Sequence, residues 1–144
     1  ISIINDIYLN IHSPKEFNNI DYDKNNKRIV LTKYDGKKYA VSEISSGQRS
    51  AIALSIFLTL NKNLVNGPDL LMFDDPVIFA DDLNVLSFFD YLRNLAVETN
   101  KQIFFATANS KIANLFSRKF GVFEEDFKQI DVEKLRMQHL KKVS

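Results

Sequence analysis

The segment ISSGQRS at residues 44–50 decides how the rest of this sequence is interpreted. It consists mainly of small and polar residues, yet it leads directly into the apolar run AIALSIFLTL at residues 51–60. A helix that is apolar on nearly all sides is buried in its own domain or covered by a partner. The sequence therefore predicts a helix over residues 47–62 that begins in this polar segment.

The start of that helix is a candidate contact for an anion. The first backbone N–H groups of a helix have no partner within the helix and carry partial positive charge. The hydroxyls of Ser45 and Ser46 add donors, and Gly47 allows the backbone to approach a phosphate closely. The alternative is an ordinary N-cap by Ser45 or Ser46, which would account for one serine but not for Gly47-Gln48-Arg49.

A second polar feature ends the apolar stretch LLMF. Residues 70–75 are typical of a short buried strand that ends in two carboxylates, Asp74 and Asp75. Ligands of open α/β sheets gather beyond the carboxyl ends of the strands. Adjacent carboxylates are costly there unless they bind a cation or take part in proton chemistry. The alternative is that Asp74 caps a helix or forms a local ion pair.

Periodicity and turn residues predict the other elements. Asp35-Gly36 between two alternating runs is a strong hairpin signal. The alternation of strands and helices after residue 60 implies an α/β fold with a mostly parallel sheet flanked by helices, and a small antiparallel hairpin region before it. The predicted elements are a helix over 1–12, an antiparallel sheet over 18–42, a helix over 83–99, a strand over 102–108, a helix over 109–120 and an edge strand over 126–133.

Composition limits the class of protein. A chain of 144 residues with 45% hydrophobic residues is long enough for one domain with a real core. The net charge of +1 does not by itself indicate a nucleic-acid binder. The absence of cysteine excludes disulfides and cysteine zinc sites and fits a reducing compartment, and no apolar run approaches the roughly 20 residues of a membrane span. We expect a cytoplasmic protein that does not enter a membrane.

The order of the polar motifs resembles that of an ABC-type ATPase. ISSGQ at residues 44–48 resembles the LSGGQ signature, and residues 70–75 resemble a Walker B strand. Asp75-Pro76 through Asp81 is similar to the E-P-x-x-x-x-D run of that family, with the D-loop at residues 80–82. Over residues 40–110 the chain therefore resembles the C-terminal lobe of an ABC ATPase head, a P-loop NTPase-like fold.

A helix and a hairpin directly before the signature resemble the SMC-like and coiled-coil DNA-repair ATPases. On this resemblance, residues 1–12 are the end of a returning coiled-coil arm, residues 13–132 are the C-terminal lobe, and residues 133–144 are a basic tail. The segments around the signature and Walker B also resemble SMC-like ATPases of bacterial anti-phage operons, the Lamassu type among them. The expected function is half of an ATP-hydrolysing head that dimerises on ATP and acts on DNA in repair or defence.

The resemblance implies ATP and Mg²⁺ as cofactors and assigns the site. It gives Asp74 as the metal ligand and Asp75 and Asn109 as catalytic residues. The nucleotide-binding residues would be Ser45, Ser46, Gly47, Gln48 and Asp81. In this family the signature contacts the γ-phosphate of a nucleotide held by the opposite head, so a second head is an expected partner. The resemblance also implies DNA and an accessory subunit or effector nuclease as partners.

The sequence departs from the family pattern in three places. Asp75 stands where the catalytic Glu is expected, and Ala108 stands where the switch His is expected, followed by Asn109. The P-loop pattern GxxxxGK[ST] does not occur in the sequence, so we expect an N-terminal P-loop lobe of the same protein to complete the head. The alternative to an ATPase is a catalytically weak, ABC-like scaffold.

The basic and histidine residues give weaker predictions. The last third of the chain is rich in lysine and arginine and could contact DNA phosphates, although Glu124, Glu125 and Asp126 interrupt it. His12 and His139 are far apart in the sequence, and we expect them at the surface rather than as ligands.

Overall fold

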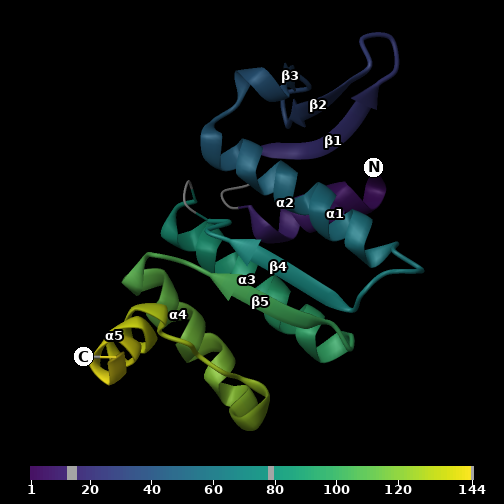
Figure 1. Ribbon diagram of the computed structural model, residues 1–144. Coiled ribbons are helices and arrows are strands. Elements are labelled where there is room, and N and C mark those ends of the chain that lie inside the picture. The colour runs from purple at the N-terminus through teal and green to yellow at the C-terminus, as the bar shows by residue number, and fades with distance from the viewer. Residues whose placement is uncertain (13–15, 78–79, 144) are drawn as a thin grey trace. The chain divides into compact units, whose positions relative to one another are not determined.

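A computed structural model describes residues 1–12, 16–77 and 80–143, with the backbone alone for residues 138–143. The chain forms two compact units, Ile1–Ala108 and Asn109–Ser144, which are described separately. Figure 1 labels their helices and strands. No helix in the described ranges combines the length and the apolar character needed to cross a membrane.

The first unit holds an antiparallel sheet, a parallel strand pair and the helices between them. The sheet has the order β1-β2-β3, and β4 pairs in parallel with β5. This arrangement confirms the predicted α/β fold class with a small antiparallel region before the signature. The elements are α1 (Ser2–Ile11), β1 (Phe17–Asp23), β2 (Arg28–Lys33), β3 (Lys38–Ala40), η1 (Val41–Glu43), α2 (Ser46–Lys62), β4 (Leu70–Asp74), α3 (Asp82–Glu98) and β5 (Gln102–Ala106).

The predicted hairpin at Asp35-Gly36 is confirmed between β2 and β3. Gly36 has a φ of 83°, a left-handed conformation that glycine adopts without steric cost. The turn is closed by hydrogen bonds from the Gly36 N–H to the Lys33 carbonyl and from the Lys33 N–H to the Lys37 carbonyl, both 2.9 Å long. The turn chemistry that the sequence supplied therefore sets the register of β2 against β3.

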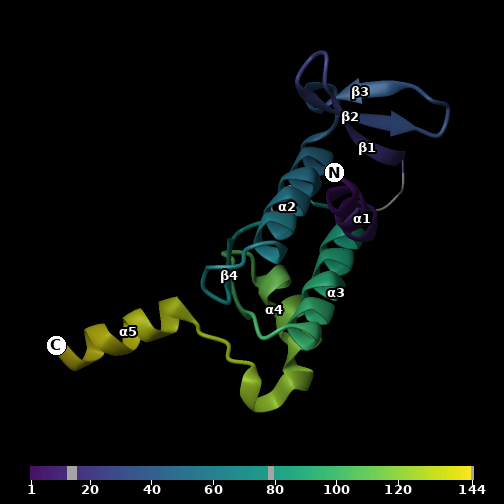
Figure 2. The ribbon, with the colours of Figure 1, turned by 90° about the vertical axis from the view of Figure 1, so that its right-hand side faces the viewer.

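Aromatic side chains fix the helices against one face of the parallel pair. Leu71 and Phe73 of β4 are buried, whereas Met72 between them is 66% exposed. The Phe73 ring makes edge contacts with Phe57 of α2 and Phe88 of α3, with centroids 5.4 and 5.5 Å apart. Figures 1 and 2 show α2 and α3 beside β4. The alternation along β4 thus places one face in the core and leaves the other exposed.

The first helix is amphipathic, as its periodicity predicts. Ile7, Tyr8 and Ile11 are buried, and α1 packs against α2, α3 and β1. The expectation of a surface histidine at position 12 is wrong, because His12 is only 6% exposed. His12 ends α1 on the same buried side, and its ring stacks on Tyr8 with centroids 5.1 Å apart.

The second unit is helical. It consists of α4 (Ser110–Phe120), η2 (Gly121–Asp126) and α5 (Val132–Val143). The predicted edge strand over residues 126–133 is wrong, because the backbone after Asp126 forms no strand before α5 begins at Val132. The Asp131 carboxylate accepts a hydrogen bond of 2.9 Å from the Lys134 N–H, so this polar segment caps a helix instead of pairing in a sheet.

Candidate functional site

The signature segment folds as a capped helix start. Ser45 is the N-cap of α2, and its Oγ accepts a hydrogen bond of 3.2 Å from the Gln48 N–H. In return, Gln48 Oε1 accepts a hydrogen bond of 2.9 Å from the Ser45 N–H. This reciprocal pair is a capping box, which satisfies two N–H groups that the helix itself leaves without a partner.

Capping involves more of this segment than a single serine. Gln48 takes part in the cap, and the Arg49 Nη1 donates to the Ile44 carbonyl at 3.1 Å. The first hydrogen bond within the helix runs from the Arg49 N–H to the Ser45 carbonyl. The N–H groups of Ser46 and Gly47 have no acceptor within the helix, so among the residues that the structure describes they can face an incoming anion.

The carboxylates that follow β4 have different surroundings. Asp74 is the last residue of β4 and is exposed. Asp75 has a φ of 44°, and its N–H donates to the Ala106 carbonyl at 2.9 Å, which continues the pairing with β5. Thr107 Oγ1 donates to Asp75 Oδ1 at 2.5 Å. The sequence did not indicate this bond, because its partners lie 32 residues apart and meet only when β4 and β5 pair.

The donor set is compatible with a partial magnesium site. In the ranges that the structure describes, His, Cys, Asp and Glu residues form no group of three or more that could hold a metal ion. Mg²⁺ in nucleotide sites uses one or two carboxylates and takes its other ligands from water and phosphate. Asp74 has the chemistry for one such ligand, so the residues present fit a magnesium ion that arrives with a nucleotide.

The predicted D-loop residue Asp81 caps the next helix. Asp81 Oδ1 accepts from the Asn84 N–H at 2.8 Å, and Oδ2 accepts from the Asn84 Nδ2 at 3.1 Å.

The negative charge of Asp81 also acts on His12 at the end of α1. Burial lowers the pKa of His12, while the carboxylates of Asp81 and Glu16 act in the opposite direction.

The predicted signature and the predicted D-loop line one small cavity. A cavity of about 10 Å³ is lined by residues of α1, of the amino-terminal halves of α2 and α3, and of the segment between β4 and α3. Gly47, Pro76 and Ala80 are among its lining residues. The fold thus brings together two motifs that the sequence could only place in order along the chain.

Asn109 lies at the start of the second unit. Its Oδ1 accepts hydrogen bonds from the Lys111 and Ile112 N–H groups at 2.9 and 3.2 Å, so it is the N-cap of α4. Its role as a catalytic residue stays a prediction, because it belongs to a different unit from Asp75.

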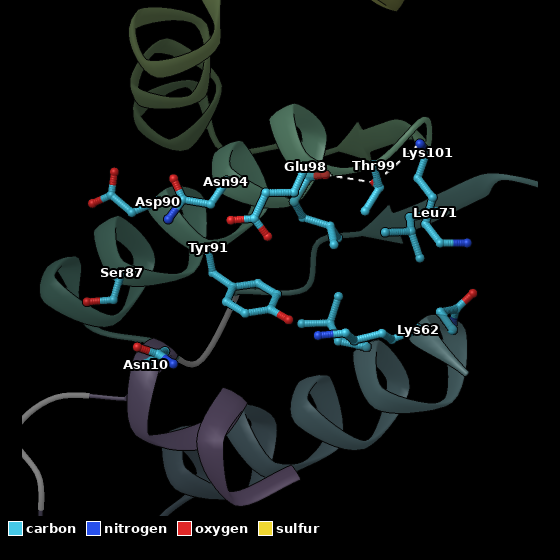
Figure 3. Close-up of a pocket in the computed structure, with 13 residues that line it drawn as sticks. Asn10, Lys62, Leu71, Ser87, Asp90, Tyr91, Asn94, Glu98, Thr99 and Lys101 are labelled. Atoms are coloured by element: carbon cyan, nitrogen blue, oxygen red, sulfur yellow. Dashed lines mark hydrogen bonds between the residues drawn. The ribbon is translucent and has the colours of Figure 1, made fainter. Parts of the chain in front are cut away.

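A larger pocket lies elsewhere on the first unit. It has a volume of about 480 Å³ and lies between α2 and α3, near the amino ends of β4 and β5. In Figure 3 the Tyr91 ring extends into this pocket, with Lys62 on one side and Glu98 on the other. Burial, and then the Glu98 charge, raise the pKa of Tyr91. None of the predicted site residues lines this pocket.

Comparison with known proteins gives relatives but no family model that matches. The chain is 29% identical over 97 residues to the DNA double-strand break repair Rad50 ATPase of Sulfurisphaera tokodaii, which is 67% of this chain and 11% of that protein. It is 32% identical over 80 residues to the Rad50 ATPase of Pyrococcus abyssi, 56% of this chain and 9% of that protein. The chain thus spans only a small part of the length of these relatives.

Solved structures match over most of the chain. One match is a structure from work on the ATP-driven dimerization and DNA stimulated activation of SMC ATPases. Its TM-score is 0.61 and its sequence identity 16%, over 78% of this chain and 68% of that chain. The Smc head domain of Pyrococcus furiosus bound to the C-terminal domain of ScpA matches with a TM-score of 0.58 and 16% identity, over 80% of this chain and 29% of that chain. The chain is therefore similar in sequence to Rad50 ATPases, and it has the α/β fold of an SMC ATPase head.

Proposed function

We propose that this chain supplies the signature, Walker B and D-loop segments of an SMC-like ATPase head that dimerises on ATP and acts on DNA. The observation that carries the proposal is that residues of the first turn of α2 and of the segment that follows β4, Gly47 and Ala80 among them, line one cavity. In this proposal the signature receives the nucleotide of the opposite head, so the signature and the D-loop must lie together on the face that meets that head, and a cavity lined by both segments supports this.

In this proposal the first turn of α2 receives a phosphate. The Ser46 and Gly47 N–H groups and the positive end of the helix bind the γ-phosphate of a nucleotide that the opposite head holds. Asp74 contributes to Mg²⁺ binding, and Asp75 orients the attacking water with Thr107 holding its carboxylate. ATP and Mg²⁺ are the proposed cofactors.

The exposed face of β4 and β5 is evidence that a second lobe packs on this sheet. Met72 and Phe104 are partners in the register of the two strands, and they are 66% and 48% exposed. Large apolar side chains side by side on a sheet indicate a surface that another element covers. We propose that the N-terminal P-loop lobe of the same protein completes the head, since the phosphate cradle itself is not in this sequence.

The biological setting is inferred from the relatives. The Rad50 proteins are named for double-strand break repair, and one matching SMC head is bound to ScpA. We propose that this chain acts in DNA repair or in anti-phage defence of the Lamassu type. DNA and an accessory subunit or effector nuclease are its proposed partners, and the cytoplasm is its proposed location.

A catalytically weak scaffold is the second candidate, and one feature of the site favours it. Asp75 is one methylene shorter than the expected Glu, and its carboxylate is already bound by Thr107. A shorter carboxylate that is held in place by Thr107 extends less far toward the attacking water molecule. Both candidates keep the ATP-dependent dimer, and they differ in whether the dimer hydrolyses ATP through Asp75.

Gly47→Asp tests the shared part of the proposal in the head joined to its P-loop lobe. A carboxylate in the first turn suits the helix dipole but repels the incoming phosphate, so the helix should form and the dimer should not. We expect ATP-dependent dimerisation, measured by analytical ultracentrifugation, to weaken by about 100-fold or more. Ala53→Asp adds the same charge at an exposed position of α2 and should dimerise normally. Unchanged dimerisation by Gly47→Asp would contradict the proposed function.

A further inference from the structure

We propose that Glu16 is a positioning residue that fixes the signature turn for its phosphate contact. The inference rests on the proposed function, because it concerns the same helix start. Glu16 does not touch the nucleotide in this proposal and acts through Gln48. The sequence gives no indication of the role, because Glu16 precedes Gln48 by 32 residues and lies outside every motif.

The contact is direct and partly buried. Gln48 Nε2 donates a hydrogen bond of 2.7 Å to Glu16 Oε2. The other end of the same amide, Gln48 Oε1, accepts from the Ser45 N–H. Gln48 is only 8% exposed, so its amide has little water with which to replace these partners. Both ends of one side-chain amide are therefore bound, one by a carboxylate and one by the signature backbone.

The carboxylate determines which way that amide points. An ionised Glu only accepts hydrogen bonds, so Glu16 can bind the NH₂ end of Gln48 and not its oxygen. This choice directs Oε1 to the Ser45 N–H and completes the capping box. If the amide were reversed, its NH₂ group would face the Ser45 N–H, and a donor would meet a donor. Glu16 and the Ser45 N–H therefore hold the amide from both ends in the one orientation in which the first turn of α2 is closed.

Glu16 lies at the start of β1, and its charge acts on Tyr8 and His12 near the end of α1. It directly precedes Phe17, the first residue of β1, and the Ile20 N–H of β1 donates to Asn5 Oδ1 of α1 at 2.8 Å. The Glu16 charge contributes to the upward shift in the pKa of Tyr8, after the larger effect of burial. The end of α1, the start of β1 and the start of α2 are therefore held near one carboxylate.

A substitution series at Glu16 separates positioning from mere stability. In the head joined to its P-loop lobe, we measure the ATP concentration that gives half-maximal dimerisation, together with the melting temperature. Glu16→Ala removes the acceptor and should raise that concentration by about tenfold, the effect of one charge-assisted hydrogen bond. Glu16→Lys, which only donates, should have at least as large an effect, and Glu16→Gln, which keeps an acceptor oxygen, should stay within about threefold of the native protein.

The matched control is Asp6→Ala, which removes an exposed carboxylate from α1 without touching Gln48. It should leave the ATP requirement unchanged. If the ATP requirements of the three Glu16 variants differ only in proportion to their melting temperatures, Glu16 only stabilises the fold, and the proposal is wrong. The proposal is also overturned if Glu16→Ala leaves the ATP requirement at the native value.

A double-mutant cycle tests the route of the effect. If Glu16 acts through the amide, Glu16→Ala should add little to the ATP requirement in a Gln48→Ala background. Additive effects of the two changes would contradict the proposed route. Gly47→Asp separates this inference from the function on which it rests. When Gly47→Asp abolishes dimerisation and Glu16→Ala has no effect, only the role of Glu16 fails. When Gly47→Asp has no effect either, the proposed function fails.

Discussion

The two ends of the β4–β5 pair differ in how their polar side chains are used. At the carboxyl end, side chains from distant segments bind one another, as Thr107 does with Asp75 and Gln48 does with Glu16. At the amino end, polar side chains line an open pocket of about 480 Å³. The Lys101–Asp69 ion pair at this end is 3.6 Å long, and its Asp69 side chain is 74% exposed.

The predicted site residues of the first unit lie at the carboxyl end, and none of them lines the pocket at the amino end. A head that takes a nucleotide between two subunits has no closed pocket by itself, because the opposite subunit supplies the other wall. In the proposed function, the half that this chain supplies consists of polar groups held in fixed orientations at an edge. Preorganised groups of this kind are typical of sites where charge must be stabilised during a reaction. If the carboxyl end is the functional one, substitutions there should affect ATP hydrolysis and substitutions at the pocket should not.

The largest expected effect is that of Asp75→Asn. Asn keeps the shape of the side chain but cannot orient and polarise water as a carboxylate does, so the kcat for ATP hydrolysis should fall by about 100-fold or more. The measurement is steady-state turnover of the head joined to its P-loop lobe, with ATP binding followed separately. Asp69→Asn at the amino end should keep native turnover. Equal turnover by Asp75→Asn and the native protein would favour the scaffold.

Thr107→Val should have an intermediate effect. Val matches the shape of Thr and removes the hydrogen bond that holds Asp75, so kcat should fall by about tenfold while ATP binding is retained. Thr99→Val is a matched control, since Thr99 Oγ1 donates to the Leu95 carbonyl at the other end of the pair. Thr99→Val should lower stability only. If both variants lose turnover to the same extent, the distinction between the two ends is not functional.

A smaller effect concerns the pH dependence of stability near the carboxyl end. Burial lowers the pKa of His12 below its ordinary value, and Asp81 and Glu16 only partly oppose this. The folded protein therefore binds fewer protons at His12 than the unfolded chain does. The free energy of unfolding should fall as the pH drops through the ordinary histidine value of about 6.5.

The measurement is urea unfolding of the native protein and of His12→Gln between about pH 7.5 and about pH 5.5. His12→Gln cannot take up a proton, so its stability should fall less over this interval. Parallel pH profiles for the two proteins would mean that His12 is not held neutral by its burial.

The smallest expected effect is that of Tyr91→Phe in the pocket. It removes a hydroxyl from a half-buried ring and should change the free energy of unfolding by less than about 0.5 kcal/mol. ATP turnover and ATP-dependent dimerisation should both be unchanged. A loss of either one would assign a function to the pocket and would break the contrast between the two ends.

Particular residues show how far the sequence could be interpreted. The Asp35-Gly36 hairpin and the helix after the signature were predictable, because turn chemistry and periodicity are local properties. The edge strand over residues 126–133 was wrongly predicted, since an apolar–polar alternation does not show whether a neighbouring strand is present. His12 was misplaced for a related reason. Its burial depends on how α1 packs on α2 and α3.

The sequence by itself determined the fold class, the order of the motifs and the identity of the residues in them. Only the tertiary structure decided which of these residues meet. The hydrogen bonds of Thr107 to Asp75 and of Gln48 to Glu16 each join positions 32 residues apart. Gly47 and Ala80 line the same small cavity. Local patterns specify helices, strands and turns, whereas contacts across the chain depend on strand pairing and helix packing, which no single segment encodes.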